Sequence, residues 1–282
     1  MKKLAGRVAV ITGAGSGIGR ALAENLGAQN CRLALADINE KGLKETADSL
    51  TAKGVEVITQ KLDVANRDAV YAFAEDVMKQ FGEVHLVFNN AGVALGATVE
   101  DMRYEDFEWL MNINFWGVVY GTKAFLPYLK QSDEGHIINI SSIFGLIGVP
   151  TQSAYNAAKF AVRGFTESLR QELEIEGSSV SCTSIHPGGI KTNIAKNARM
   201  DDGIKKITGT SGEKATAEFE KMFRTTPAEA ASTIINGVKH NKRRVLIGAD
   251  AVAVDTMQRL LPTTYQKLME SGQKMLLKRK GK

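Results

Sequence analysis

The sequence predicts an α/β fold in which one parallel sheet is covered by helices on both faces, the doubly wound arrangement. Short apolar runs, typical of buried strands, alternate with longer segments that have the 3.6-residue period of amphipathic helices. A glycine-rich turn separates the first apolar run from the first periodic segment. The chain has 282 residues and no proline- or serine-rich linker divides it, so we expect one large domain.

The predicted strands are short and rich in Val, Ile, Leu and Ala. They cover residues 8–11, 33–36, 55–60, 84–88, 136–140, 180–185 and 244–247. The predicted helices between them cover residues 18–29, 40–52, 67–80, 115–130 and 154–174. In doubly wound folds, ligands bind beyond the carboxyl ends of the strands. We therefore expect the functional residues at that edge of the sheet.

The end of the chain exceeds what such a fold requires. Residues 1–250 are expected to form the main domain, and residues 251–282 an extension of two helices, 251–261 and 264–277, separated by Pro262. Within the main domain, residues 193–226 are weakly patterned apart from a predicted helix at 215–223. This segment fits either a lid that closes over a ligand or an ordinary surface helix and loop.

The positive charge of the chain is concentrated at its end. The formal net charge is +5, and Lys274, Lys278, Arg279, Lys280 and Lys282 supply five positive charges. The rest of the chain is formally neutral, which argues against a nucleic-acid partner. The tail favours a solvated, frayed end, and peripheral contact with an acidic membrane surface is the less favoured alternative.

Cysteine usage and the N-terminus favour a cytoplasmic protein. Cys31 and Cys182 each lie in an apolar stretch, which predicts buried, reduced thiols rather than a disulfide. The four histidines have no metal-ligand spacing, so no metal site is expected. The first residues resemble a signal peptide, but Arg7 and the glycines after it interrupt the apolar segment.

The turn after the first strand is predicted to bind a dinucleotide. Glycine allows a tight turn and a close approach of the backbone to a pyrophosphate, and the helix N-terminus adds a favourable dipole. The residues expected to contact the cofactor in this turn are Gly13, Ser16, Gly17, Ile18 and Gly19. A Walker-type phosphate loop is excluded because no Lys-Ser or Lys-Thr pair follows the last glycine.

Asp37 is predicted to select NAD over NADP. It ends the second strand, where a carboxylate accepts hydrogen bonds from both ribose hydroxyls and repels a 2′-phosphate. At ~4 Å this repulsion is ~1 kcal/mol in water and ~4 kcal/mol at an effective dielectric of ~20. Ser16 carries no charge that would attract the phosphate. The alternative is that Asp37 is a solvated acid beside a helix cap.

Several motifs that follow one another along the chain resemble those of the short-chain dehydrogenase/reductase family. The glycine-rich turn matches TGxxxGxG, and Tyr155 to Lys159 matches YxxxK. Ser142 lies thirteen residues before Tyr155, and Asn114 lies three residues before a glycine, as in that family. The resemblance extends from about residue 6 to residue 247. It implies a Rossmann fold and an NAD(P)-dependent oxidoreductase that forms a homodimer or homotetramer.

The resemblance also assigns roles to individual residues. The catalytic residues that it implies are Asn114, Ser142, Tyr155 and Lys159. The cofactor-binding residues that it implies are Asp63, Val64, Asn90, Ala91, Gly92, Tyr155, Lys159, Pro187, Gly188, Ile190 and Thr192. By the same resemblance, Asn114 holds a water of a proton relay that runs through Lys159.

The spacing of Tyr155 and Lys159 places both on one face of a helix. A free phenol has a pKa of ~10, and an ammonium group ~4 Å away at an effective dielectric of ~20 would lower that pKa by ~3 units. The pair is therefore expected to act as a general base toward an alcohol or a general acid toward a carbonyl. Ser142 is expected to orient the substrate oxygen.

The expected reaction transfers a hydride between a secondary or primary alcohol and a ketone or aldehyde. Apolar residues around the expected site suggest an apolar small-molecule substrate: Val93, Leu95, Ile143, Phe144, Ile147, Val149 and Ile190. One alternative is a non-catalytic NAD-binding regulator or scaffold on the same fold. Another is a different NAD-dependent chemistry, such as epimerisation or dehydration. The helices at 115–130 and 154–174 are the candidate subunit interfaces.

Overall fold

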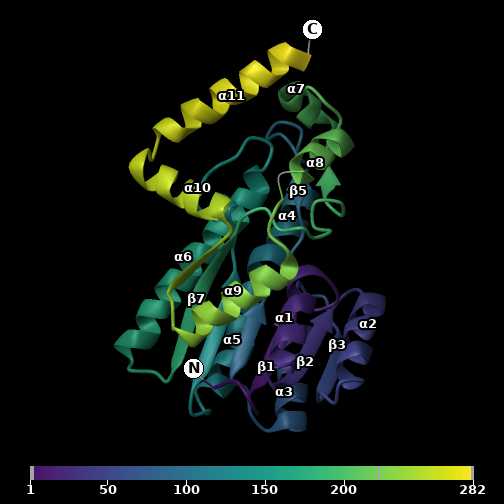
Figure 1. The fold of residues 1–282 in the computed structure, drawn as a ribbon, viewed down its shortest axis with the longest axis vertical. Coiled ribbons are helices and arrows are strands. Elements are labelled where there is room, and N and C mark those ends of the chain that lie inside the picture. Colours follow the sequence, from purple (N-terminus) through teal and green to yellow (C-terminus); the bar gives the residue numbers. More distant parts are fainter. Residues whose placement is uncertain (1–2, 222, 281–282) are drawn as a thin grey trace.

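The computed structural model describes residues 3–221 and 223–280 and contains a seven-stranded parallel sheet (Figure 1). The strand order is β3-β2-β1-β4-β6-β7-β9. The strands are β1 (Val8–Thr12), β2 (Arg32–Asp37), β3 (Val57–Lys61), β4 (Leu86–Asn89), β6 (Gly135–Ile140), β7 (Val180–Pro187) and β9 (Arg244–Ile247). The order reverses between β1 and β4, which is the point where doubly wound folds bind ligands. The predicted fold class is confirmed.

Three helices cover each face of the sheet. One face carries α1 (Gly17–Gly27), α2 (Glu40–Thr51) and α9 (Pro227–Lys239), whose apolar side chains share one buried cluster. The other face carries α3 (Arg67–Phe81), α5 (Gly117–Leu129) and α6 (Ser153–Ile175), which share a second cluster. The central strands β1, β4, β6 and β7 are buried on both sides, which explains why they read as apolar runs, whereas the edge strand β3 is half-buried to exposed.

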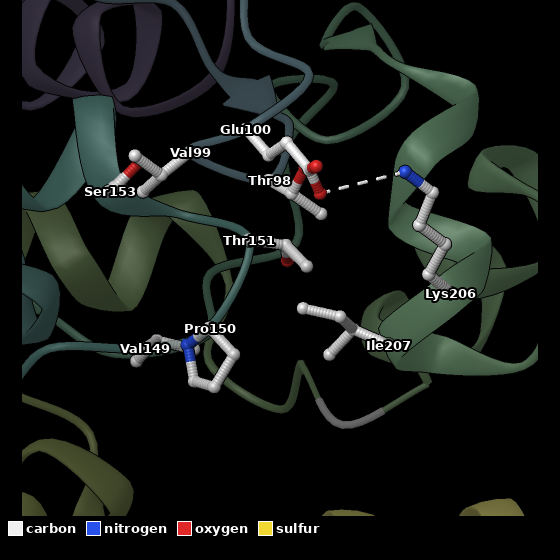
Figure 2. A pocket seen from close by; sticks show the side chains of 9 residues that line it. All are labelled: Thr98, Val99, Glu100, Val149, Pro150, Thr151, Ser153, Lys206 and Ile207. Carbon is white, nitrogen blue, oxygen red and sulfur yellow. Dashed lines mark ion pairs between the residues drawn. The ribbon is translucent and has the colours of Figure 1, made fainter.

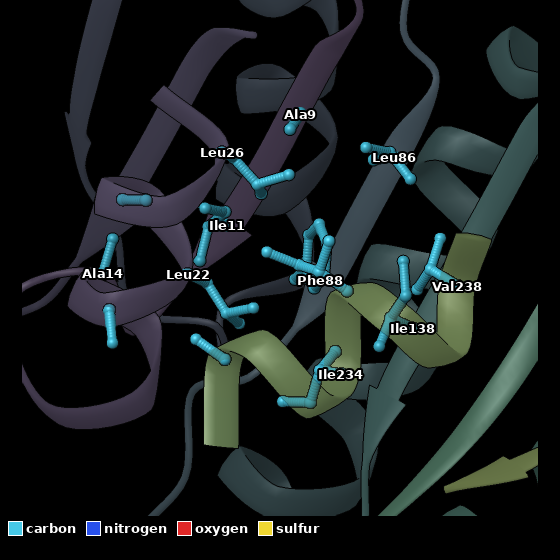
Figure 3. Close-up of a cluster of buried hydrophobic side chains, with 14 of the residues drawn as sticks. Ala9, Ile11, Ala14, Leu22, Leu26, Leu86, Phe88, Ile138, Ile234 and Val238 are labelled. Atoms are coloured by element: carbon cyan, nitrogen blue, oxygen red, sulfur yellow. The ribbon is translucent and has the colours of Figure 1, made fainter. Parts of the chain in front are cut away.

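Helix α9 was not expected from the sequence, although it completes the core. Figure 3 shows Ile234 and Val238 of α9 beside Leu22 of α1 and Phe88 of β4. Full burial of each such side chain contributes about 1.5–3 kcal/mol. The start of α9 has a local signal, because Thr226 and Glu229 form a capping box around Pro227. The sequence TPAE could therefore have revealed this helix.

The region before α5 also differs from expectation. A helix α4 (Tyr104–Met111) continues through a π-helical turn (Asn112–Trp116) directly into α5, so the helix predicted at 115–130 begins earlier. Two short strands, β5 (Leu95–Gly96) and β8 (Arg199–Met200), form a separate parallel pair. Strands of two residues have no readable period, and only the tertiary fold brings these two segments together.

After β9 the chain forms two helices, α10 (Ala249–Leu260) and α11 (Thr264–Lys280), near the two predicted at 251–261 and 264–277. The division into a main domain and an extension stays a prediction, and residues 281–282 of that extension lie outside the described residues. These helices lead away from β9 and pass above the carboxyl edge of the sheet (Figure 1). Between β8 and α9 lie two further helices, α7 (Lys205–Thr208) and α8 (Gly212–Glu220), and α11 contacts α7. Within residues 3–221 and 223–280 no helix is long and apolar enough to cross a membrane.

Both cysteines are free and buried. Burial raises the pKa of the Cys31 thiol to about 11 and that of the Cys182 thiol to about 12. Each thiol donates to a backbone carbonyl, Cys31 to Leu4 and Cys182 to Thr166. They are therefore protonated core residues in this fold. Across the described part of the chain, no group of three or more His, Cys, Asp or Glu residues could hold a metal ion.

Candidate active site

A cavity of about 580 Å³ lies at the carboxyl edge of the sheet. Most of the candidate residues line it: Gly13, Ser16, Gly17, Ile18, Asp37, Asp63, Val64, Asn90, Ala91, Gly92, Ser142, Tyr155, Lys159, Pro187, Gly188, Ile190 and Thr192. Two candidates, Gly19 and Asn114, are not among the lining residues. The structure thus brings residues from six strand ends and from the helices α1 and α6 into a single cavity.

The glycine-rich turn has the backbone geometry that its glycines permit. Gly13 has φ +68° and Gly17 has φ +53°, both in the left-handed region. Ser16 is the N-cap of α1 but makes no capping hydrogen bond with its side chain. Gly19 lies behind the turn, where an added Cβ would be 2.1 Å from the Gly13 carbonyl oxygen. Gly19 therefore allows α1 to pack closely on the turn.

Asp37 lies at the cavity wall and is held by backbone amides. Its Oδ2 accepts from Gly15 N at 2.7 Å and its Oδ1 accepts from Asn39 N at 2.8 Å. The cap of α2 is Asn39, whose side chain accepts from the Gly42 amide. Asp37 is therefore not the helix cap itself, and its carboxylate faces the cavity.

Arg20, a cation in the first turn of α1, does not line the cavity. Its guanidinium donates to the carbonyl oxygens of Gly15 at 2.7 Å and Gly42 at 3.1 Å and pairs with Glu45 at 3.1 Å. Among the described residues that line the cavity, Lys159 is the one Lys or Arg. Of the described residues that line the Asp37 end of the cavity, none is a Lys or an Arg.

Asn90 joins the ends of β1 and β4. Its Nδ2 donates to Thr12 O at 2.9 Å, while the backbone amides of Asn90 and Ala91 donate to Thr12 Oγ1 at 3.0 and 3.1 Å. This polar contact holds the glycine-rich turn beside the segment Asn90 to Gly92. The resulting wall is made of small residues and exposed backbone, which suits close contact with a dinucleotide.

Ser142, Tyr155 and Lys159 form a buried polar cluster at the centre of the cavity. Ser142 follows β6, and Tyr155 and Lys159 project from adjacent turns of α6. The Ser142 and Tyr155 side chains are hydrogen bonded. Lys159 Nζ lies 5.5 Å from the centre of the Tyr155 ring and donates to Ile140 O at 3.0 Å. The three side chains that the sequence spacing singled out, Ser142, Tyr155 and Lys159, thus lie together in the structure.

Burial dominates the protonation of this cluster. It raises the pKa of Tyr155 to about 12, and the hydrogen bond with Ser142 acts in the opposite direction. Burial also lowers the pKa of Lys159 to about 8. The expectation of a Tyr155 pKa near neutrality was therefore wrong for the protein alone. That expectation counted the attraction of the ammonium and left out the cost of burying a phenolate.

A family model described as short chain dehydrogenase matches residues 7–203. The chain belongs to the short-chain dehydrogenase/reductase family. SadH of Mycobacterium tuberculosis, a proposed oxidoreductase, is 50% identical over 274 residues, covering 96% of this chain and 97% of SadH. Human estradiol 17-beta-dehydrogenase 11 is 32% identical over 269 residues, covering 94% of this chain and 82% of that protein.

A solved structure agrees with this family membership. A short-chain dehydrogenase/reductase from Burkholderia phymatum in complex with NAD superposes with a TM-score of 0.84 at 32% identity, covering 92% of this chain and 95% of that one. The chain is thus an oxidoreductase of this family with a nucleotide-binding Rossmann fold. The order of the motifs along the sequence predicted this family correctly.

In this family member, Asn114 has a structural partner. The Asn114 side chain is fully buried, accepts from Val93 N at 2.8 Å and donates to Val93 O at 2.8 Å. Both polar ends of the amide thus hold the irregular segment that follows Gly92. The side chain therefore fixes the position of Val93, which lines the cavity.

Gln152 and Asp250 are among the polar residues of the cavity wall that sequence reasoning missed. Gln152 lies one turn before Tyr155, and Asp250 projects from the first turn of α10. The Asp250 Oδ2 accepts from Gly189 N at 2.7 Å, so the extension holds the segment that follows Pro187. The sequence did contain a signal that Asp250 belongs to the site. Asp250 follows the predicted last strand by three residues, and that strand, β9, ends at the same edge of the sheet as the others.

The apolar residues expected near the substrate separate into three groups. Val93, Ile143, Phe144 and Ile190 line the cavity. Leu95 and Ile147 are buried and line no part of it, because they pack in the interior. Val149 lines a different cavity nearby. The segment 193–226 contributes Asn193 to Ala195, Asn197 and Phe223 to the cavity wall, and its role as a lid stays a prediction.

Proposed function

We propose that this oxidoreductase transfers a hydride between NAD and a secondary or primary alcohol, forming a ketone or aldehyde, or catalyses the reverse reduction. The observation that carries the proposal is the buried Ser142–Tyr155–Lys159 cluster in the same cavity as the glycine-rich turn. A hydroxyl, a phenol and an amine that meet beside a dinucleotide site can bind a substrate oxygen and move its proton. The substrate in this proposal is a neutral, largely apolar small molecule.

The residues of the cavity fit a dinucleotide. The turn at Gly13 and Gly17 and the N-terminus of α1 would hold the pyrophosphate, and Asp37 would bind the adenosine ribose. Asp63, Val64, Ile190 and Thr192 also line the cavity; the first two would lie beside the adenine and the last two beside the nicotinamide. When bound, NAD accepts or donates the hydride, and its oxidised ring adds a positive charge to the site.

Selectivity for NAD over NADP is supported by the charges at the Asp37 end. Asp37 lines the cavity, and Arg20 is engaged by Gly15, Gly42 and Glu45. A 2′-phosphate there would meet a carboxylate and no described cation. The cofactor in this proposal is therefore NAD, with NADP disfavoured.

Tyr155 would act on the substrate oxygen. With a pKa of about 12, its hydroxyl is protonated at neutral pH and can donate to the carbonyl oxygen during reduction. In the opposite direction, the alcohol proton passes to Tyr155 Oη as the hydride leaves the carbinol carbon. A positive charge brought near the phenol would favour the phenolate needed for that direction. Lys159 would hold Tyr155 in position, and Ser142 would orient the substrate oxygen toward it.

The experiment that tests this proposal measures absorbance of reduced nicotinamide with a panel of secondary alcohols, with NAD and NADP in parallel. Tyr155→Phe should retain NAD affinity in calorimetry and lose turnover by about 10²–10⁴-fold. Substantial turnover by Tyr155→Phe would contradict the assignment of the proton donor. Retained NAD binding without turnover of any alcohol by the wild type would favour the alternative, a non-catalytic NAD-binding regulator.

We further propose a homodimer or homotetramer formed through α5 and α6. Trp116 at the end of the π-helical turn is 43% exposed and stacks on Tyr120 of α5, and Phe160 of α6 is 41% exposed. Exposed aromatic side chains on neighbouring helices are typical of an interface. Analytical ultracentrifugation of Trp116→Glu should show a smaller species than the wild type, and an unchanged mass would contradict this interface.

A further inference from the structure

A second cavity, of about 530 Å³, lies beside the catalytic cavity. It is lined by the segment Thr98 to Glu100, by the loop Val149 to Thr151 with Ser153, and by Lys206 and Ile207 of α7. Figure 2 shows the side chains of Thr151 and Ile207 pointing into the space between the loop and α7. Its volume is within the range of cavities that bind small molecules.

The two cavities share one wall. Gln152 lines the catalytic cavity, whereas its neighbours Thr151 and Ser153 line the second one. Thr151 has φ +68°, an unusual value for a β-branched residue. This backbone conformation occurs where the chain passes from the second cavity, lined by Thr151, to the catalytic cavity, lined by Gln152. The wall is secured because Ala97 N donates to Thr151 O at 2.9 Å and Ala97 pairs with Gln152.

The lining of the second cavity suits a neutral, apolar ligand. Val99, Val149, Pro150 and Ile207 supply apolar surface, and Ser153 Oγ is buried without a hydrogen-bond partner among the described residues. Lys206 is the one cation of this lining, and it is already 3.7 Å from Glu100 and 3.1 Å from Asp101. An anionic ligand would have to compete with these two carboxylates.

The C-terminal extension holds both walls of this cavity. The Tyr265 hydroxyl of α11 accepts from Gly148 N at 3.0 Å, next to the loop wall. Gln273 of α11 donates from Nε2 to Ile207 O at 2.9 Å, on the α7 wall. α11 thus links the two walls of the cavity through the side chains of Tyr265 and Gln273.

We propose that the second cavity receives the distal, apolar end of a long neutral alcohol or ketone whose reacting carbon lies at Tyr155. This inference rests on the proposed function. The dinucleotide would fill much of the catalytic cavity, so a long substrate needs further space. The second cavity lies beyond Gln152, whose side chain would turn aside in the substrate complex to let the apolar end pass. The substrate class is therefore a neutral molecule with an extended aliphatic or fused-ring body and a hydroxyl or carbonyl near one end.

The experiment compares kcat/KM for straight-chain secondary alcohols from butanol to dodecanol length with NAD. In the wild type, kcat/KM should rise about fourfold for each methylene that becomes buried. Ile207→Trp, which fills the cavity from α7, should lower the ratio of kcat/KM for the longest to the shortest alcohol by about fifteenfold, the value of two methylenes. Val149→Phe, from the opposite wall, should lower the same ratio.

Leu268→Trp is the matched control, because Leu268 of α11 is 56% exposed and lines neither cavity. It should leave the ratio unchanged. The proposal is overturned if kcat/KM of the wild type does not rise with chain length, or if both cavity variants keep the wild-type ratio.

A thermal-shift measurement with NAD and the longest alcohol separates this inference from the proposed function. Stabilisation of the wild type that both variants lose, without turnover of any alcohol, would support the cavity and refute the reaction. Turnover of short alcohols with no binding of long ones would refute the cavity alone.

Discussion

Two buried histidines should make the stability of this protein sensitive to mild acid. Burial lowers the pKa of His136 on β6 to about 3 and that of His186 on β7 to about 4. The His136 Nε2 lies 2.7 Å from Thr183 Oγ1. His186 Nδ1 donates to the carbonyl oxygen of Ser142 at 2.9 Å, and its Nε2 accepts from Ser184 Oγ at 2.9 Å. Both rings are therefore held neutral in the folded protein.

The direction in which stability changes with pH follows from the histidine pKa of about 6.5 in the unfolded chain. Above that pH both states carry neutral histidines, so their contribution to stability is fully present. As the pH falls below it, the unfolded chain takes up protons that the folded chain does not, and stability falls by up to ~1.36 kcal/mol per pH unit for each histidine. On acidification from about pH 7.5 to about pH 5, His136 and His186 should each lower the free energy of unfolding by about 2 kcal/mol.

The summed loss of about 4 kcal/mol is large against a typical stability of about 5–15 kcal/mol. His85 adds to it in the same direction, since burial lowers its pKa as well. The paired carboxylates, such as Asp133 and Glu174, have pKa values held below their ordinary range, so they titrate in more acidic solution. The window above about pH 5 therefore isolates the histidines.

The assay is urea unfolding, followed by circular dichroism at both pH values. His136→Gln and His186→Gln keep a polar side chain and remove the titrating ring, so each should reduce the loss on acidification by about 2 kcal/mol. His240→Gln, at an exposed histidine, is the control and should keep the wild-type loss. A wild-type loss below about 1 kcal/mol, or an undiminished loss in the double variant, would refute the reasoning.

Three further predictions concern the cofactor site and the core. Asp37→Asn should shift the ratio of NADP to NAD affinity toward NADP by about fivefold to about a thousandfold, measured by calorimetry, because it removes the charge that repels the phosphate; an unchanged ratio contradicts that role. Gly19→Ala should destabilise the fold by about 1–3 kcal/mol and weaken NAD binding, since its Cβ would meet the Gly13 carbonyl at 2.1 Å. The control is Gly164→Ala, in an open part of α6 where an added Cβ would have nothing within 4 Å. Measured by thermal unfolding alongside Gly19→Ala, it should stabilise the fold by about 0.5–1 kcal/mol, and equal changes in stability for the two variants would refute the steric argument. Thr226→Ala should cost about 0.5–2 kcal/mol in urea unfolding by removing the cap of α9, and Thr226→Ser should restore most of it.

Much of the fold was predictable because its signals are local. The central strands of the sheet are buried on both faces, so they appear as apolar runs, and the helices that cover them keep a 3.6-residue period. The first turn needs positive φ angles at positions 13 and 17, and glycine is the residue type that adopts them without strain. Likewise, a Tyr and a Lys four residues apart must share a helix face, as Tyr155 and Lys159 do.

The remaining features depend on contacts between segments that are far apart in the sequence. β5 and β8 are too short to have a period and exist because Leu95 pairs with Arg199. The pKa of Tyr155 is set by how deeply it is buried, which no spacing reveals. The second cavity lies between segments near residues 98, 150 and 206, and α11 contacts two of them at Gly148 and Ile207. The sequence by itself determined the parallel sheet, the nucleotide turn and the family, whereas the tertiary structure decided the protonation of the site and the space beside it, since both depend on long-range packing.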